Sequence, residues 1–368
     1  MPTMILAMHM ANELLSLPVA VVTVGLAAGA VGLAARRSGK KLRVELVPLM
    51  GVMGAFVFAA QMINFTLPFM PGTSGHLGGA VLLAILLGPA PAIVTMTGIL
   101  IIQCLLFQDG GLLALGCNVI NMGVVPAILG WWIFRQVAGA GRPGKSRLYL
   151  GAWLACTIGV AGGAALVPIQ AGISGVLRIP FVDFLLVMLG VHLLIGMVEG
   201  AISFAVLAYL WKVQPALLEG SAIKTNIPAN ARLSSGVVIA SMAVTSLLLA
   251  GVVSLFASSH PDGLEWSCQE HRYCGLAEGQ ALENPSSAVV ALDQFQQRYA
   301  PMPDYSRRAA PLGEAVNDEK SPQQTQEPES AESIDGWVSL AGLAGTAASL
   351  GIVYVVGLAL KRKEKATK

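Results

Sequence analysis

The residues with the clearest chemical use lie near the start of the chain, at Met8 and His9. If the chain began at Met8, the terminal amine, the amide nitrogen of His9 and its imidazole could surround one divalent ion. Such a planar set of nitrogen donors suits Ni(II), Cu(II) or Co(II) better than Mg(II) or Ca(II). A lone histidine near a terminus is more often a solvated side chain. The hypothesis of a metal site therefore needs a second ligand.

A second candidate ligand, His76, lies in the glycine-rich run 71–79, Pro-Gly-Thr-Ser-Gly-His-Leu-Gly-Gly. Glycines around one histidine let the backbone turn tightly and bring the imidazole inward. The alternative is a loop histidine that faces water. Four polar residues could support a metal-bound imidazole through hydrogen bonds or shape the site. They are Gln61, Asn64, Asn118 and Asn121.

His192 and Glu199 form a separate constellation, because seven residues place them on one face of a helix. A carboxyl group inside a membrane span is a functional candidate. A buried structural pair is an equally good interpretation. If the pair is functional, it indicates an ion-coupled secondary transporter or channel for divalent transition metals. The other polar residues near this region, Gln103, Gln108 and Asp109, are predicted to bond between helices.

The composition requires a membrane environment for these residues. The chain is 55% hydrophobic and 12% charged, with a mean hydropathy of +0.68. Soluble domains carry about 25% charged residues. The sequence predicts an all-α polytopic membrane protein, with a seven-helix core bundle and two additional transmembrane helices. The run Gly88-Pro89 should divide 78–107 into a hairpin. The predicted spans are 17–35, 46–67, 78–90, 92–107, 113–134, 148–170, 181–211, 236–257 and 337–360.

Lysine and arginine clusters predict the orientation, since cytoplasmic loops are enriched in both. Clusters at 36–43, 135–147, 212–232 and 361–363 place those segments inside. The N-terminus is then outside and the C-terminus cytoplasmic in a multi-pass protein of the inner membrane. His9 and His76 fall on the same outer side.

The chain divides into a membrane domain at 8–212, a cytoplasmic linker at 213–235 and a second domain at 236–360. In the second domain, two spans flank an acidic extracytoplasmic loop, 258–336. Cys268 and Cys274 in this loop could form a disulfide, or act with His260 and His271 as a metal relay. No phosphate-binding loop of the Gly-x-x-x-x-Gly-Lys-Ser/Thr type occurs, and no protease signature. The chain is therefore predicted to be no enzyme and to hydrolyse no ATP alone.

Three blocks carry a specific resemblance: 8–16 (MHMANELLS), 49–87 (with INFTLPFMPGTSGHLGG) and 107–123 (FQDGGLLALGCNVINMG). They resemble the CbiM/NikM family of cobalt and nickel substrate-binding membrane components of energy-coupling factor transporters, a branch of ABC importers. The resemblance implies seven helices and an external N-terminus. It implies that the amine of Met8, the amide nitrogen and imidazole of His9, and His76 hold the metal. It also implies a membrane coupling subunit and two cytoplasmic ATPase subunits as partners. Co²⁺ or Ni²⁺ would be the transported substrate, with no permanent cofactor.

The run Pro261-Asp262-Gly263-Leu264-Glu265 resembles the signature of the PDGLE (CbiN/NikN-like) accessory component, here fused to the same chain. One departure concerns the start, because seven residues precede Met8. The donor set implied by the resemblance needs a free amine there, so Met8 is the expected functional start. The sequence does not choose between cobalt and nickel, since both ions accept nitrogen donors.

Overall fold

The computed structural model describes residues 9–41, 46–139, 143–177, 180–213, 235–258, 260–268, 287–306 and 336–366. These residues are almost entirely helical. The helices of the first half are α1 (Leu17–Lys41), α2 (Leu46–Gln61), α3 (Ala80–Leu87), α4 (Pro89–Phe107), α5 (Leu115–Asn118), α6 (Val125–Ala138), α7 (Lys145–Ala164), α8 (Leu166–Ile173) and α9 (Phe181–Val213). A two-stranded ladder of β1 (Phe65–Thr66) and β2 (Ser74–Gly75) lies between α2 and α3.

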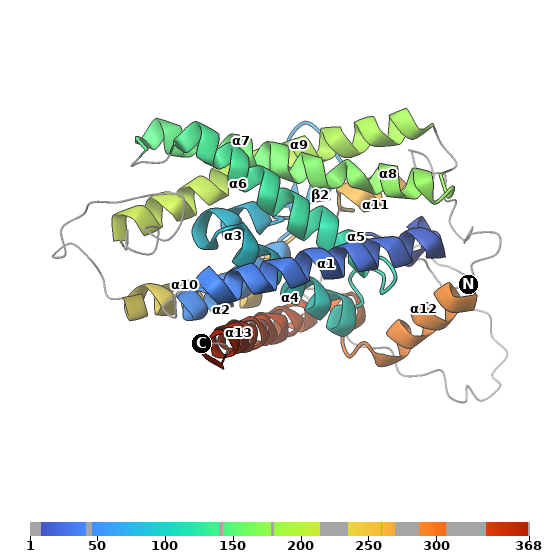
Figure 1. The fold of residues 1–368 in the computed structure, drawn as a ribbon. Coiled ribbons are helices and arrows are strands. Elements are labelled where there is room, and N and C mark those ends of the chain that lie inside the picture. Colours follow the sequence, from blue (N-terminus) through green and yellow to red (C-terminus); the bar gives the residue numbers. More distant parts are fainter. Residues whose placement is uncertain are drawn as a thin grey trace.

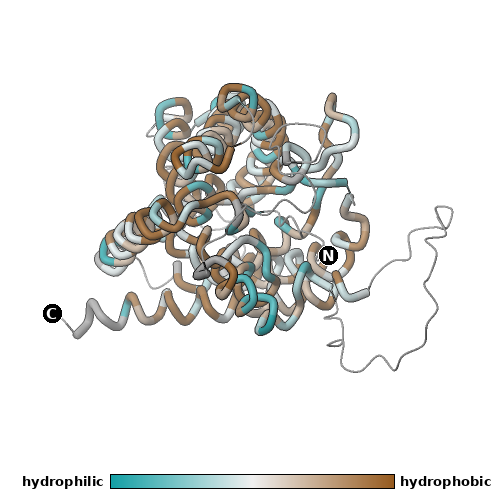
Figure 2. Tube along the Cα trace, turned by 90° about the vertical axis from the view of Figure 1, so that its right-hand side faces the viewer, coloured by the Kyte–Doolittle hydropathy of each residue, from teal (hydrophilic) through white to brown (hydrophobic). Residues whose placement is uncertain are grey.

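Among the described residues, the second half contributes four α-helices and two short 3-10 helices. The α-helices are α10 (Ser235–Gly251), α11 (Gly263–Cys268), α12 (Ser287–Tyr299) and α13 (Gly336–Ala366), and the short helices are Val253–Phe256 and Pro303–Tyr305. The long helices run side by side in one bundle, and α12 lies at the end away from the C-terminal end of α13 (Figure 1). A view along the bundle shows hydrophobic stretches throughout the helices, with hydrophilic stretches between them (Figure 2). The fold is therefore the all-α polytopic membrane architecture that the composition predicts.

Seven helical segments among the described residues are long and apolar enough to cross a membrane. Their outer faces carry large exposed apolar side chains, including Val21 and Leu26 on α1, Leu186 on α9, and Val355 on α13. Apolar side chains on an outer face suit contact with lipid, while helices satisfy their own backbone hydrogen bonds. The seven segments are Leu17–Gly39, Pro89–Phe107, Leu115–Ala138, Lys145–Ile173, Phe181–Val213, Gly236–Phe256 and Gly336–Lys361.

Two of the nine predicted spans are shorter in the structure. The helix α2 ends at Gln61, because the chain turns into β1 instead of continuing to residue 67. The predicted span 78–90 is wrong in extent: α3 has eight residues, a length of about 12 Å, and all of them are buried. The predicted break is confirmed, because Gly88 has a φ of 88° and α4 begins at Pro89. The segment α3 is therefore a short helix buried inside the protein.

The two halves of the chain share one hydrophobic core. Fully buried Phe58 of α2 and Phe107 at the end of α4 pack with their ring centroids 5.6 Å apart. Both α10 and α13 of the second half contact α2, and Val353 of α13 and Val238 of α10 belong to the same buried cluster. The second half therefore packs as part of the bundle.

Candidate metal site

His9 lies inside the protein, and an asparagine holds the residue that follows it in the chain. The side chain of His9 is 2% exposed. Asn118 accepts a hydrogen bond from the amide of Met10 at 3.0 Å and donates one to the Met10 carbonyl at 3.1 Å. The amide of Gly111 donates to the same carbonyl. Asn118, predicted to shape the site, therefore fixes the backbone next to His9.

His76 follows directly after β2, which pairs with β1 through Phe65 and Gly75. The Nδ1 atom of His76 lies 3.0 Å from the carbonyl oxygen of Leu77. A carbonyl can only accept, so the ring proton sits on Nδ1 and the lone pair of Nε2 is available to a metal. Burial, and then the nearby His9, lower the pKa of His76 below 6.5. His76 is therefore a neutral imidazole at neutral pH.

The two imidazoles lie together, with ring centroids 5.9 Å apart and ring planes at 63°. A metal at a typical imidazole distance would lie about 3.2 Å from the centroid of each ring that binds it. One ion can therefore bridge both rings. The Nε2 atom of His9 is buried and makes no hydrogen bond to the described residues. A buried nitrogen without a partner leaves this side of the His9 ring open to an ion.

Asp109 faces His9, with 2.6 Å between Asp109 Oδ1 and His9 Nδ1. Burial disfavours charge on His9, but the Asp109 carboxylate outweighs it and raises the pKa of His9 above 6.5. Burial alone would raise the pKa of Asp109, but the nearby His9 has the larger effect and lowers this pKa below 3.8. The next residue, Gly110, has a φ of 85°, and a Cβ there would meet His9 Cβ at 2.9 Å. Glycine thus lets the Asp109 loop approach His9.

From the sequence, Asp109 was predicted only to form hydrogen bonds between helices. In the structure it lies beside His9 in the candidate metal site. The signal that could have found it is the run Gln-Asp-Gly-Gly at 108–111, an acidic residue followed by two glycines at a helix end. Such a run allows a tight turn that exposes a carboxylate.

The other residues predicted to support the site, Gln61, Asn64 and Asn121, make hydrogen bonds with groups other than the two imidazoles. Gln61 donates to the Gly78 carbonyl at 2.9 Å and accepts from Gln103 at 3.1 Å, so it holds the turn after His76. Asn121 lines the pocket and exchanges two hydrogen bonds with Gln170. Asn64 does not line the pocket, and its carbonyl accepts from the amide of Ser258. His76 Nδ1 bonds Leu77, so the expected hydrogen bond from Gln61 or Asn64 to this ring is wrong.

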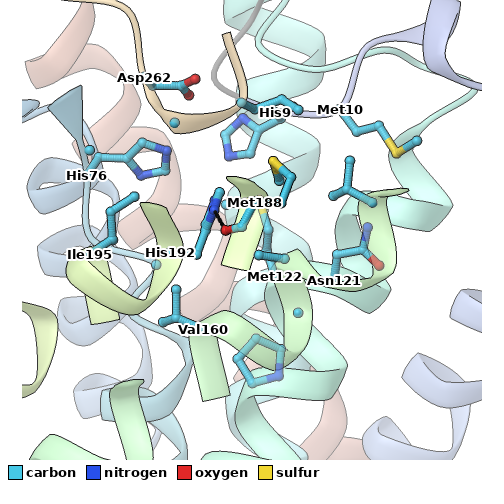
Figure 3. Close-up of a pocket in the computed structure, with 18 of the residues that line it drawn as sticks. His9, Met10, His76, Asn121, Met122, Val160, Met188, His192, Ile195 and Asp262 are labelled. Atoms are coloured by element: carbon cyan, nitrogen blue, oxygen red, sulfur yellow. Dashed lines mark hydrogen bonds between the residues drawn. The ribbon is translucent and has the colours of Figure 1, made fainter. Parts of the chain in front are cut away.

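Glu199 and His192 line the same cavity of about 90 Å³ but do not bond to each other. The carboxylate of Glu199 accepts from the amides of Gly78 at 2.7 Å and Gly79 at 3.1 Å. Gly79 has a φ of 79° and precedes α3, so Glu199 holds the turn that carries His76. His192 donates from Nδ1 to the Met188 carbonyl at 2.8 Å. Figure 3 shows His192 and Met188 below the pair of His9 and His76.

The signature turn of the second half covers the cavity. The Pro261 carbonyl accepts from the amide of Ser74 at 2.8 Å, and the His260 carbonyl accepts from the Ser74 hydroxyl at 2.6 Å. Asp262 lines the cavity beside the two imidazoles (Figure 3). Its carboxylate also contributes to the raised pKa of His9.

Some predicted donors lie outside the described residues. These are Met8, His271 and Cys274, together with the side chain of Cys268. Among the described residues, no group of three or more His, Cys, Asp or Glu side chains is placed to hold a metal. The side chains described here do not form a full ligand set by themselves.

Comparison with known proteins assigns the chain to a family. The family model for the cobalt uptake substrate-specific transmembrane region (CbiM) matches residues 9–217. The chain belongs to the CbiM family. The model of the PDGLE domain matches residues 236–362, so this CbiM-family chain carries both parts in one polypeptide. It is a multi-pass membrane protein of a family of cobalt and nickel transport proteins.

Some relatives of this CbiM-family chain are named for nickel transport and others for cobalt transport. A protein of Archaeoglobus fulgidus named as a fused nickel transport protein, NikMN, is 36% identical over 217 residues, which cover 59% of this chain and 68% of the relative. The cobalt transport protein CbiM of Geobacter sulfurreducens is 33% identical over 226 residues, covering 58% and 62%. A crystal structure of a truncated transition metal transporter has 29% identity and a TM-score of 0.48, covering 55% of this chain and 97% of that one.

Proposed function

We propose that this chain is the substrate-capture membrane subunit of an energy-coupling factor ABC importer for Co²⁺ or Ni²⁺. The observation that carries the proposal is the pair of buried imidazoles, His9 and His76, with centroids 5.9 Å apart beside a cavity. Asp109 and Asp262 add negative charge that favours a divalent cation. The names of relatives for nickel and cobalt transport support the choice of metals.

In this function the domain 8–212 binds the ion and the domain 236–360 covers the site. The linker 213–235 joins the two domains. The outer side of an inner membrane holds the N-terminus and the site, and the C-terminus is cytoplasmic. Because the sequence has no phosphate-binding loop, a membrane coupling subunit and two cytoplasmic ATPase subunits supply the energy. The subunit itself is no enzyme.

The donor set combines side chains with main-chain nitrogens. The amine of Met8, the amide nitrogen and imidazole of His9, and His76 would surround the ion. An amide nitrogen and an imidazole of one residue close a six-membered chelate ring only through Nδ1, the atom that here faces Asp109. Metal loading in this mode therefore replaces Asp109 at Nδ1. A diamagnetic Ni(II) complex supports this planar set, whereas a paramagnetic complex supports binding through Nε2. Mass spectrometry of the purified N-terminus tests whether Met8 carries a free amine.

The alternative, an ion-coupled transporter or channel that uses His192 and Glu199, has less support. Both Glu199 oxygens accept backbone hydrogen bonds from the His76 turn, and His192 bonds Met188. These contacts favour structural roles for the pair.

Uptake measurements in cells separate the two functions. We expect accumulation of Ni²⁺ or Co²⁺ when the chain is produced with the coupling and ATPase subunits, and none when the ATPases carry an inactive phosphate-binding loop. Uptake that persists without ATP hydrolysis would favour the ion-coupled alternative. Comparing the two ions in the same assay identifies the preferred metal.

Metal affinity should fall as the pH is lowered through the pKa of His9. A ligand imidazole must be neutral, so the bound ion displaces at least one proton. The pKa of His9 is raised above 6.5. Protonation of His9 therefore begins to weaken metal binding at a higher pH than protonation of an unperturbed imidazole would. His76, with a lowered pKa, stays a ligand over this range. We expect affinity to fall at least about tenfold per pH unit below the His9 pKa, measured by calorimetric titration with Ni²⁺.

The control for this pH dependence is Asp109→Asn. The amide removes the carboxylate that raises the pKa of His9, so the onset should move to lower pH. An onset that stays in place would contradict the role of Asp109 in the titration.

A further inference from the structure

A segment of the second half contacts the loop that carries Asp109. Binding of the ion by the two histidines does not by itself require this contact. We call residues 287–306, which contain α12 and the short helix Pro303–Tyr305, the outer segment. This segment packs against the end of α4 and against the loop 108–112, which carries Asp109. The amide of Met302 donates to the carbonyl of Leu106 at 3.1 Å. The outer segment thus reaches the back of the metal site.

Tyr305 is the residue of the outer segment that touches the site. Its hydroxyl donates to Asp109 Oδ2 at 2.6 Å, and its ring stacks on Phe107 with centroids 4.7 Å apart and planes at 16°. Tyr305 is buried, and burial together with Asp109 raises its pKa well above 10, so the phenol keeps its proton. The backbone has φ values of 51° at Asp304 and 54° at Tyr305. Residues other than glycine adopt this conformation at a cost that the surrounding contacts must offset.

Gln296 ties the outer segment to the same loop through three hydrogen bonds. Its amide group donates to the carbonyls of Cys104 at 2.9 Å and Gly110 at 2.7 Å, and its oxygen accepts from the amide of Leu112 at 3.1 Å. Asp293 also contacts the side chain of Asn12, near His9 in the chain. Gln296 therefore bonds the backbone both before and after Asp109.

Asp109 stands between Tyr305 and His9. One carboxylate oxygen, Oδ2, accepts from the phenol, and the other, Oδ1, lies 2.6 Å from His9 Nδ1. The three groups form a continuous row from the outer segment to the imidazole, across residues widely separated in the chain. Asp109 lies at the ring nitrogen through which the proposed donor set would bind the ion, so its place sets the orientation of the imidazole and how readily the ion displaces the carboxylate.

We propose that Tyr305 is a positioning residue of the metal site, which sets the place of Asp109 and through it the imidazole of His9. This inference rests on the proposed function, because it takes His9 as a ligand. It gives the second half of the chain a role in metal affinity besides the cover formed by Pro261 and Asp262.

The physical reason lies in the two oxygens of one buried carboxylate. Without the phenol, Asp109 Oδ2 loses its donor in a place shielded from water. The carboxylate then moves from its place or bonds His9 Nδ1 more strongly, and either change opposes binding of the ion there. Losing a hydrogen-bonding residue next to the ligands of a metal site typically costs about 10–100-fold in affinity.

Tyr305→Phe in the full-length chain tests the proposal, since it removes only the hydroxyl and keeps the stack on Phe107. We expect Ni²⁺ affinity, measured by calorimetric titration of the purified protein, to fall at least about tenfold. Tyr299→Phe is the matched control, because Tyr299 belongs to the same segment and is 60% exposed. Its affinity should equal that of the wild type. An unchanged affinity in Tyr305→Phe would overturn the proposal.

A double-mutant cycle separates positioning from a general loosening of the segment. If Tyr305 acts through Asp109, Tyr305→Phe should have no further effect on affinity in an Asp109→Asn background. Equal effects of Tyr305→Phe in both backgrounds would show that the phenol does not act through the carboxylate.

A measurement on the metal-free protein distinguishes this inference from the proposed function. The ring resonances of His9, recorded by NMR with selectively labelled histidine and assigned with His9→Ala, should shift in Tyr305→Phe and not in Tyr299→Phe. If they shift while the wild type binds no Ni²⁺, the positioning holds and the proposed function fails. If the wild type binds Ni²⁺ and neither affinity nor resonances respond to Tyr305→Phe, the inference fails and the function stands.

Discussion

Replacing His76 with alanine is expected to reduce Ni²⁺ affinity by at least about 100-fold, and His9→Ala should do the same. Changes behind a metal ligand already cost about 10–100-fold, and removing the ligand itself should exceed that range. The two rings come from different segments and lie 5.9 Å apart at an angle of 63°, so neither can take the place of the other. Calorimetric titration of the purified full-length protein measures the effect.

The matched control for these variants is His260→Ala. His260 is exposed and lies on the turn that covers the site, but its side chain does not line the cavity. Its contact with Ser74 uses the backbone carbonyl, which alanine retains. We expect wild-type affinity in this variant, and equal yields of folded, membrane-inserted protein for all three. Wild-type affinity in His9→Ala and His76→Ala would refute the site.

Glu199→Leu is expected to destabilise the fold and weaken metal binding together. The substitution removes the acceptor of the Gly78 and Gly79 amides at a position that is fully buried. A buried donor left without a partner costs about 1–3 kcal/mol, so loss of both bonds should cost about 2–6 kcal/mol. Thermal unfolding of the metal-free protein should show a lower Tm. Affinity should fall because the same turn carries His76.

The comparison variant is Glu199→Gln, which keeps one acceptor oxygen and should lie between Glu199→Leu and the wild type in Tm. An ion-coupled mechanism predicts another outcome. In that case both variants, and His192→Ala as well, would lose transport without a change in Tm or in metal affinity. This result would restore the alternative function for the pair.

The sequence predicted features that depend on local properties of the chain. Long apolar runs favour helices in a membrane, since no water is available to the backbone, and the run Gly88-Pro89 favours a break between two helices. His9 and His76 were singled out because histidine is scarce and the charge distribution places both on one side. The lengths of α2 and α3 were beyond this reasoning. An apolar run such as 78–90 is equally suited to lipid and to a protein interior.

What only the tertiary structure decided is which polar groups share a site. Asp109 looked like a residue between helices because its partners, His9 and Tyr305, lie 100 and 196 residues away. Glu199 looked like a partner of His192, yet it bonds backbone amides 121 residues earlier in the chain. Helical periodicity tells which side chains share a face of one helix, but not which backbone lies opposite. The sequence by itself therefore determined a membrane bundle with two candidate histidine ligands. Packing of distant segments decided that Asp109, Asn118 and Glu199 hold them, and that the second half of the chain closes the site.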